Sequence, residues 1–358
     1  MNELSSMSFS SLPMAANMAL FVLAAAVVWI AGTRLAIIAD VIADRKRIGK
    51  ALMGLLFLAA ATELPELVTT ISAAMKNNAA LVLNNMFGGI TMQTAILAVA
   101  DGAVIHATLT SYPRKTTLAL EGILLILLLG FLLAIISLND FFGDFMLFGR
   151  IGIGTVMLGF AYIAVIQFLR FHEANARWRP LDFPDEGKAV FGGTGPQDFK
   201  TMPLARLYGF TAIAVLSILV AGLLLVQLAE VLALQSGLGS SFVGVTLLAA
   251  STSLPELSTT IAAVRIGAFT MAISNIFGSN LIMLALLLPA DMFYEGGRIL
   301  EQADRSARFA LLSGIMVTSV YVIGLLMRSK RRFFALGYDS LIVLVLYLAS
   351  LVVFFVLR

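Results

Sequence analysis

Two glutamates, each directly after a proline in an apolar stretch, are the residues of this chain best suited to chemistry. Glu66 lies in residues 61–71 and Glu256 in residues 251–261, two segments 190 positions apart that are identical at eight of eleven positions. A carboxylate inside a membrane helix costs about 2.5 kcal/mol or more, so it is usually there for a function. Two such carboxylates at equivalent places in one chain predict a cation site between two halves.

Further oxygen ligands accompany both glutamates. Proline lacks the N–H that would bond the carbonyl four residues earlier, so Pro65 should free the carbonyl of Ala61 and Pro255 that of Ser251. The spacing also predicts that hydroxyls share a helical face with each glutamate. The first face is Thr62, Glu66, Thr69 and Thr70, and the second is Thr252, Glu256, Thr259 and Thr260. Carboxylates, hydroxyls and carbonyls are ligands that Ca²⁺ and Na⁺ accept. The alternative is that the glutamates pair with arginines or bond helix hydroxyls for packing, but few basic residues lie at similar depth.

An asparagine with nearby glycines occurs in the next apolar segment of each half. The two stretches are residues 85–89 and residues 275–280. Amides add neutral oxygen ligands, and glycines permit close helix approach or local unwinding. The alternative is small-residue packing with asparagine as an interhelical hydrogen-bonder. Because both stretches accompany the glutamates, we expect Asn85 and Asn275 to help form the site.

Glu63 has no counterpart in the second half, where Ser253 stands at the equivalent position. It lies three residues before Glu66, so the two side chains are neighbours on a helix. Two nearby buried carboxylates do not both ionise easily. With Glu256 the site would hold three carboxyls, and one Ca²⁺ balances two charges, which leaves room for one proton or one Na⁺. Glu63 therefore either carries a proton, permanently or during transport, or turns away to bond a backbone or hydroxyl group.

Composition places these residues in a membrane. Of 358 residues, 60% are hydrophobic and 13% are charged, against about 25% charged in soluble domains. Many runs are long enough to cross a hydrocarbon core of about 30 Å as helices, which predicts an all-α polytopic membrane protein with ten transmembrane helices. An outer-membrane barrel would show short segments of alternating polarity instead. We place the spans near residues 14–39, 51–75, 79–104, 117–137, 147–170, 206–234, 240–265, 268–292, 307–327 and 334–357.

The duplication extends well beyond the glutamate motifs at the same offset, with Gly32 matching Gly222 and Asp101 matching Asp291. We therefore divide the chain into a first five-helix repeat (1–171), a polar cytoplasmic linker (172–205) and a second five-helix repeat (206–358). Five spans is an odd number, so the two repeats are inverted relative to each other, and such repeats place ion sites near the membrane midplane. We expect Asp101 and Asp291 to lie at helix ends in wet vestibules with a structural role.

Charge and residue types limit the other functions. Basic connectors at 45–50, 114–115 and 328–332 fall on one face, so we expect a multi-pass protein of the cell membrane with both termini outside the cytoplasm. The net charge of +3 reflects these flanking residues and not a nucleic-acid surface. Cysteine is absent and the histidines have no partners at metal spacing, so we expect neither an enzyme nor a cofactor. The expected partners are the lipid bilayer and the transported cations, with a monomer as the working state.

The motifs together resemble the cation/Ca²⁺ exchanger superfamily, especially the membrane region of sodium/calcium exchangers. Its two repeats carry a Gly-Thr-Ser-x-Pro-Glu motif and a Gly-Asn-x-x-Gly-Ser-Asn motif. Residues 251–256 and 274–280 match closely, while the first repeat is looser. There Glu63 replaces a serine and Ile90 replaces the last asparagine, although Gln93 restores one polar group.

This resemblance implies antiport of Ca²⁺ against a monovalent cation by alternating access. Glu66 and Glu256 would be the central Ca²⁺ ligands, and Thr62, Thr252 and Ser253 would supply oxygens to Ca²⁺ or Na⁺, with Asn85 and Asn275 nearby. We expect export of Ca²⁺ driven by Na⁺. The alternative is an H⁺-coupled antiporter of Ca²⁺ or another divalent cation, motivated by Glu63. A cation channel is less favoured, because channels usually build a filter from several subunits or from backbone loops.

Overall fold

The computed structural model describes residues 9–104, 107–113, 116–142, 146–147, 151–175, 197–236 and 249–357. The first repeat contains α2 (Met14–Lys46), α3 (Lys50–Leu52), the π-helix η1 (Met53–Leu58), α4 (Ala59–Thr62), α5 (Leu64–Met75), α6 (Ala79–Asp101), the 3₁₀ turn η2 (Leu109–Ser111), α7 (Thr117–Phe142) and α8 (Ile153–Asn175). After α9 (Gln197–Thr201), the second repeat contains α10 (Leu204–Gln235), α12 (Leu254–Arg265), α13 (Phe269–Phe293), the 3₁₀ turn η3 (Ile299–Gln302), α14 (Arg305–Met327) and α15 (Tyr338–Leu357). Two short antiparallel hairpins, β1 (Met146–Leu147) with β2 (Ile151–Gly152) and β3 (Arg332–Phe333) with β4 (Leu336–Gly337), precede α8 and α15.

The helices fit a polytopic membrane protein. In the described part of the chain, seven helices are long and apolar enough to cross a membrane, and a bent pair, Lys50–Thr62 with Leu64–Met75, makes an eighth. The apolar stretch Tyr338–Phe354 belongs to the shorter apolar helices, those of 10–17 residues. Residues 240–248 of the seventh predicted span and most of the predicted linker lie outside the described residues. The count of ten spans therefore stays a prediction.

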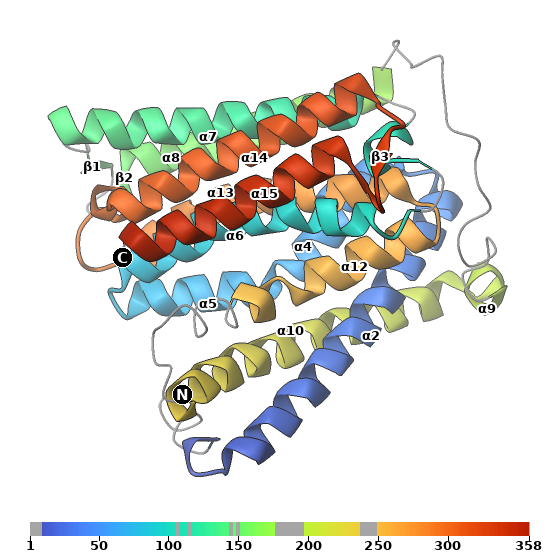
Figure 1. The fold of residues 1–358 in the computed structure, drawn as a ribbon, viewed down its shortest axis with the longest axis horizontal. Coiled ribbons are helices and arrows are strands. Elements are labelled where there is room, and N and C mark those ends of the chain that lie inside the picture. The colour runs from blue at the N-terminus through green and yellow to red at the C-terminus, as the bar shows by residue number, and fades with distance from the viewer. Residues whose placement is uncertain are drawn as a thin grey trace.

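Equivalent helices of the two repeats run in opposite directions (Figure 1). Near the start of α2, the Asn17 amide donates a hydrogen bond of 3.0 Å to Gln235 at the end of α10. At the other end of α2, the Arg45 guanidinium donates one of 3.1 Å to the carbonyl of Phe199, just before α10. An antiparallel pair of equivalent helices is what an inverted repeat requires.

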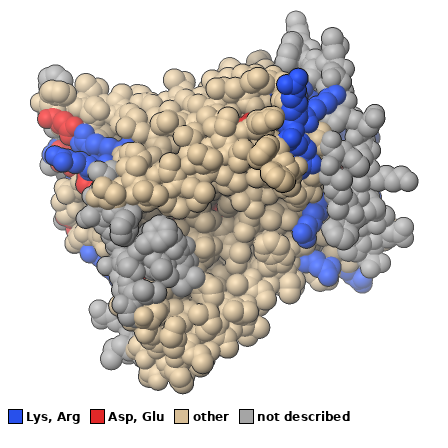
Figure 2. All heavy atoms as spheres, viewed as in Figure 1, with Lys and Arg blue, Asp and Glu red and all other residues tan. Residues whose placement is uncertain are grey.

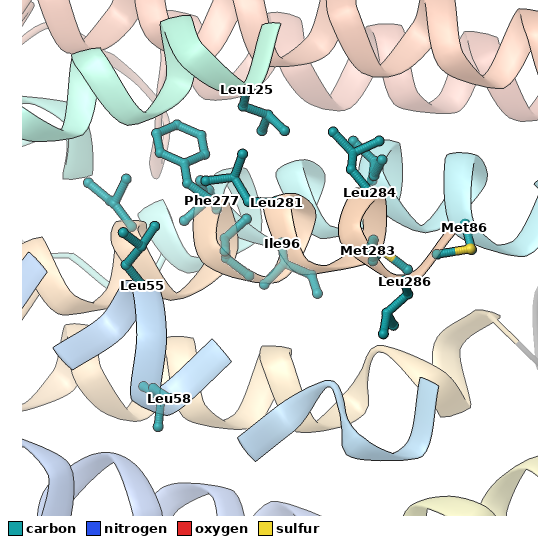
Figure 3. Packing of buried hydrophobic residues seen from close by; sticks show 14 of the residues in the cluster. Leu55, Leu58, Met86, Ile96, Leu125, Phe277, Leu281, Met283, Leu284 and Leu286 are labelled. Atoms are coloured by element: carbon teal, nitrogen blue, oxygen red, sulfur yellow. The ribbon is translucent and has the colours of Figure 1, made fainter. Parts of the chain in front are cut away.

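Helix α13 lies at the centre of the apolar core, between η1 and α7 (Figure 3). Leu125 of α7 faces Leu281 of α13, and Leu55 of η1 lies near Phe277. The contact between η1 and α13 is made backbone to backbone, because a Cβ added at Gly278 would sit 2.3 Å from the Leu55 carbonyl oxygen. Glycine at this position lets the two helices approach to a distance that no other residue would allow.

The equivalent aspartates Asp101 and Asp291 are wholly buried, each at the C-terminal end of its helix. Asp101 accepts a hydrogen bond of 2.6 Å from the N–H of Gly337 in β4, and Asp291 accepts one of 2.8 Å from the N–H of Gly152 in β2. Each aspartate thus ties its own repeat to the hairpin of the other. The expectation of wet vestibules is wrong, because backbone N–H groups take the place of water, while the expected structural role agrees with these bonds.

Charged side chains gather at the two ends of the face in view, with a belt of other residues between them (Figure 2). One end carries basic residues and the other carries both signs. Arg328 donates to the carbonyl of Pro113 at 2.6 Å, and Arg308 pairs with Asp140 at 2.6 Å. Large apolar side chains such as Leu127 remain exposed. Such a surface fits contact with lipid, and the direction in which the chain crosses the membrane stays a prediction.

Candidate cation site

The helix carrying Glu66 is broken three residues before it. The segments Lys50–Thr62 and Leu64–Met75 meet at Glu63 with a bend of 50°. Glu63 has φ −79° and ψ −1°, and the equivalent Ser253 has nearly the same conformation, φ −91° and ψ 4°, before α12. The prolines two residues later lack the N–H that a continuous helix needs, which explains why both breaks fall there. The prediction that Thr62 shares one helical face with Glu66, Thr69 and Thr70 is wrong, because the break separates α4 from α5.

The break brings two kinds of helix end to the glutamates. Glu66 and Glu256 lie in the first turns of α5 and α12, where the positive end of the helix dipole favours a carboxylate. The carbonyl of Ala61 lies on the other side of the break, and it suits a cation because Pro65 has no N–H to bond it. A broken helix therefore supplies both the anionic ligands and the groups that stabilise them.

The three carboxylates at the breaks are buried without a basic partner. Glu63 and Glu66 are each 2% exposed and Glu256 is 0% exposed. They are close enough to one another to interact electrostatically, and within the described residues no Lys or Arg forms an ion pair with any of them. Like charges that repel in a medium of low dielectric need a compensating cation or a proton. The packing alternative, in which the glutamates pair with arginines, is not what the described residues show.

Glu63 has a neutral partner from the next helix. The Gln93 amide of α6 donates a hydrogen bond of 2.7 Å to Glu63 Oε1, while Glu63 Oε2 has no hydrogen-bond partner. The hydroxyl of Ser279 in α13 lies nearby. Glu63 therefore has an amide as its hydrogen-bond partner, with a hydroxyl close by, and the choice between a proton on Glu63 and a bond to a hydroxyl stays a prediction.

Asn275 of α13 faces the second broken helix. Its amide nitrogen donates to the hydroxyls of Thr259 at 3.1 Å and Thr260 at 3.3 Å, and its oxygen has no hydrogen-bond partner. Holding the nitrogen on α12 leaves the oxygen free for another ligand. The equivalent Asn85 is only half-buried on α6, so the two asparagines are not in equivalent surroundings.

A contact between α6 and α13 was not predicted. The amide nitrogen of Asn280 donates to Thr94 Oγ1 at 3.1 Å, and both side chains are wholly buried. Asn280 belongs to the repeated motif, but Thr94 is one of several threonines in an apolar helix. The sequence offered no signal for Thr94 beyond its place next to Gln93.

The remaining predicted ligands lie at the two breaks. Ala61, Thr62, Ser251, Thr252 and Ser253 are all buried. The hydroxyl of Thr62 donates to the carbonyls of Leu58 and Ala59, each at 3.2 Å, and lies near the Glu256 carboxylate of the other repeat. The structure therefore places the first break close to the second glutamate, as a shared site requires.

Many buried oxygen atoms around the breaks have no hydrogen-bond partner among the described residues. They are Glu63 Oε2, Glu66 Oε2, both oxygens of Glu256, Gln93 Oε1, Asn275 Oδ1, Ser279 Oγ and Asn280 Oδ1. Each unsatisfied buried polar group costs about 1–3 kcal/mol, so a concentration of them calls for an explanation. All can act as oxygen ligands, the type that Ca²⁺ and Na⁺ prefer.

Carboxylates alone do not complete such a site. In the described part of the chain, no group of three or more His, Cys, Asp or Glu side chains could hold a metal ion. The expectation that the site holds three carboxyls, with Glu63 beside Glu66 and Glu256, stays a prediction. Two glutamates supplemented by amide, hydroxyl and carbonyl oxygens remain the arrangement that the geometry supports.

Comparison with known proteins identifies the family. The family model described as sodium/calcium exchanger protein matches residues 16–169 and 206–356. Among curated proteins, the chain is 41% identical over 91 residues to the inner membrane protein YrbG of Escherichia coli, and 30% identical over 125 residues to the sodium/calcium exchanger MaX1 of Methanosarcina acetivorans. These alignments cover 25% and 33% of this chain, and span only 27% and 32% of the two relatives.

Solved structures of the sodium-calcium exchanger NCX_Mj share the fold. One soaked with Na⁺ and no Ca²⁺ superposes with a TM-score of 0.70 at 18% identity, over 95% of this chain and 99% of that one. Another, soaked without either ion, gives a TM-score of 0.68 at 18% identity, over 94% and 98%. The inverted arrangement of helices, the paired Pro–Glu breaks and the family model lead to one conclusion, that the chain belongs to the sodium/calcium exchanger family.

Proposed function

We propose that this protein is a secondary antiporter that exchanges Na⁺ for Ca²⁺ across the cell membrane by alternating access. The observation that carries the proposal is the pair of buried glutamates, Glu66 and Glu256, in the first turns of two equivalent broken helices, with unpartnered oxygens around them. The family and the names of MaX1 and NCX_Mj support the choice of ions.

In this proposal Glu66 and Glu256 bind Ca²⁺ directly. Hydroxyls and carbonyls at the breaks complete the coordination of Ca²⁺ or Na⁺, together with the free oxygen of Asn275. The candidate ligands at the breaks are Ala61, Thr62, Glu63, Ser251, Thr252 and Ser253, and Asn85 lies on the neighbouring helix. One acidic site cannot hold both ions at full occupancy, so each ion displaces the other, and alternating access couples their movements.

Helices α2 and α10 form the moving part in this proposal. They pack against each other along their length and lie beside α5 and α12 (Figure 1). A Cβ at Gly32 of α2 would sit 2.0 Å from Ser258 Oγ of α12, and one at Gly222 of α10 would sit 2.8 Å from Pro65 Cγ of α5. Because glycine has no side chain, Gly32 and Gly222 would let α2 and α10 slide past α12 and α5, the two helices that carry the Pro–Glu pairs.

The test is uptake of ⁴⁵Ca²⁺ into proteoliposomes loaded with Na⁺. Uptake should depend on the outward Na⁺ gradient and should be lost in Glu66→Gln and in Glu256→Gln, because each change removes one of the two negative charges that balance Ca²⁺. Glu301→Gln is the matched control, since that glutamate pairs with Arg298 outside the site. Uptake that survives both site substitutions would refute the proposed ligands.

A second candidate, coupling to protons, is favoured by the environment of Glu63. This carboxyl is buried, has a neutral amide partner in Gln93 and lies near two other carboxylates. A buried carboxyl in that setting is well placed to exchange a proton when Ca²⁺ arrives or leaves.

Vesicles carrying only a pH gradient distinguish the two candidates. Under H⁺ coupling, the pH gradient alone should drive Ca²⁺ uptake, and Glu63→Gln, which keeps the shape but cannot exchange a proton, should abolish that response. Unchanged pH dependence in Glu63→Gln would exclude Glu63 as the proton carrier. Wild-type uptake that ignores the pH gradient would exclude proton coupling altogether.

A further inference from the structure

Glu121 is a buried carboxylate that the proposed ion site does not use. It lies near the start of α7, is 0% exposed, and accepts a hydrogen bond of 2.5 Å from Ser274 Oγ of α13. Its second oxygen has no hydrogen-bond partner among the described residues. Burying a carboxylate with so few partners is costly, so its presence in a membrane helix calls for a role.

The partner of Glu121 directly precedes a proposed ligand. Ser274 is followed by Asn275, whose amide nitrogen is held by Thr259 and Thr260 and whose oxygen has no hydrogen-bond partner. The hydrogen bond from Ser274 thus acts on the same helical turn that presents the free amide oxygen.

The same turn also packs closely against η1. A Cβ added at Gly54 of η1 would lie 2.4 Å from the Met271 carbonyl oxygen, 2.9 Å from the backbone nitrogen of Asn275 and 3.0 Å from the Ser274 Cβ. The turn therefore contacts both η1 and α7. A hydrogen bond has a preferred direction, whereas apolar packing has none. The bond to Glu121 is therefore the contact with α7 that can fix the rotation of this turn about the axis of α13.

The first repeat has a related contact with different chemistry. Asn84, which is equivalent to Ser274, accepts a hydrogen bond of 2.7 Å from Ser306 of α14. In both repeats, the residue before the motif asparagine is bonded to the fourth long helix of the other repeat. The contact in the first repeat is neutral and only partly buried, and Asn85 beside it is half-buried. The buried carboxylate occurs beside the asparagine that is wholly buried.

We infer that Glu121 is a positioning residue, which through Ser274 fixes the turn of α13 that presents the Asn275 oxygen to the transported cation. Glu121 does not touch the ion. The inference rests on the proposed antiport, and it adds a residue outside the two Pro–Glu breaks to the determinants of Ca²⁺ affinity.

The test is the concentration dependence of ⁴⁵Ca²⁺ uptake by the full chain in Na⁺-loaded proteoliposomes. Ser274→Ala and Glu121→Leu both remove the hydrogen bond, and each should raise KM for Ca²⁺ about three- to tenfold, the loss expected for one hydrogen bond. Vmax should change less than twofold. The double variant should be no worse than the worse single variant, because both changes remove the same contact.

Two further variants separate positioning from charge and from general damage. Glu121→Gln keeps an oxygen that can accept from Ser274 and should restore the wild-type KM within about twofold. Ser319→Ala is the matched serine control, because that hydroxyl bonds the carbonyl of Ile315 within its own helix; it should leave KM unchanged. Ser274→Ala removes a single oxygen atom, so it tests the positioning role of Glu121 even if Glu121→Leu does not fold.

The uptake measurements separate a failure of the positioning role from a failure of the proposed antiport. An unchanged KM in Ser274→Ala would overturn the positioning role while leaving the antiport intact. Glu121→Gln behaving like Glu121→Leu would also overturn it, since the charge and not the hydrogen bond would then matter. Absence of Ca²⁺ uptake by the wild type would overturn the proposed function itself, and the inference with it.

Discussion

Gly88 and Gly278 occupy equivalent positions in the two repeats, yet the structure predicts opposite responses to the same substitution. A Cβ at Gly278 would lie 2.3 Å from the carbonyl oxygen, 2.7 Å from the Cα and 2.8 Å from the carbonyl carbon of Leu55. A Cβ at Gly88 would meet nothing within 4 Å. We therefore expect Gly278→Ala to be harmful and Gly88→Ala to be tolerated.

The size of the effect follows from these contacts. The atoms that a Cβ at Gly278 would meet are backbone, so they cannot rotate away, and the closest approach is about 1 Å short of the 3.4 Å at which ordinary contact begins. Moving η1 and α13 apart by that amount should cost about 1–3 kcal/mol. Alanine in a helix is up to about 1 kcal/mol more favourable for folding than glycine. At Gly88 no clash opposes this gain, so Gly88→Ala should stabilise the protein slightly. The separation of η1 from α13 that Gly278→Ala forces would also move η1 relative to Asn275, which lies three residues earlier on α13.

Two measurements check this prediction. Thermal unfolding of the purified protein in detergent should show a lower melting temperature for Gly278→Ala and an equal or slightly higher one for Gly88→Ala. Ca²⁺ uptake in proteoliposomes should fall in Gly278→Ala and remain in Gly88→Ala. If the two variants were equally harmful, or if Gly278→Ala were neutral, the close backbone packing between η1 and α13 could not be correct.

Three further predictions concern the frame around the site. Asp291→Ala should lower the free energy of unfolding by about 3 kcal/mol or more, because the N–H groups of Gly152 and Ile299 and the hydroxyl of Thr155 all lose a buried acceptor; a wild-type melting temperature would contradict this. Gly222→Val should slow uptake by placing a side chain against Pro65, whereas Gly209→Val on the same helix, where a Cβ meets nothing within 4 Å, should not; equal rates would exclude sliding of α10 past α5. Since the chain has no cysteine, a thiol reagent can test the orientation, and Lys330→Cys should react only from the cytoplasmic side; reaction from outside would reverse the predicted topology.

The sequence predicted the membrane class and the resemblance to the exchanger family because these depend on local chemistry. Apolar runs must be helical in lipid, where each backbone group needs a partner within its own segment. Pro65 and Pro255 lack an N–H in any structure, so the freed carbonyls and the helix breaks follow from residue type alone. The duplication could be read because it holds register over many residues on both sides of the glutamates.

The details that failed depend on contacts between segments. The shared face of Thr62 and Glu66 assumed a straight helix, but a bend of 50° lies between them. Asp101 and Asp291 were expected beside water, but backbone N–H groups from distant hairpins bury them. No pattern within a single helix could have predicted these partners.

Residue types and their order indicate which groups are candidate ion ligands, because a carboxylate beside a proline in an apolar helix has few other uses. How the surroundings of those groups differ between the repeats depends on the packing of the helices. This packing gives Glu63 the amide of Gln93, holds the nitrogen of Asn275 on α12 and leaves Asn85 half-buried. The physical reason is that ligand type is a property of one residue, whereas the direction of a hydrogen bond and the distance between two helices depend on residues far apart in the chain.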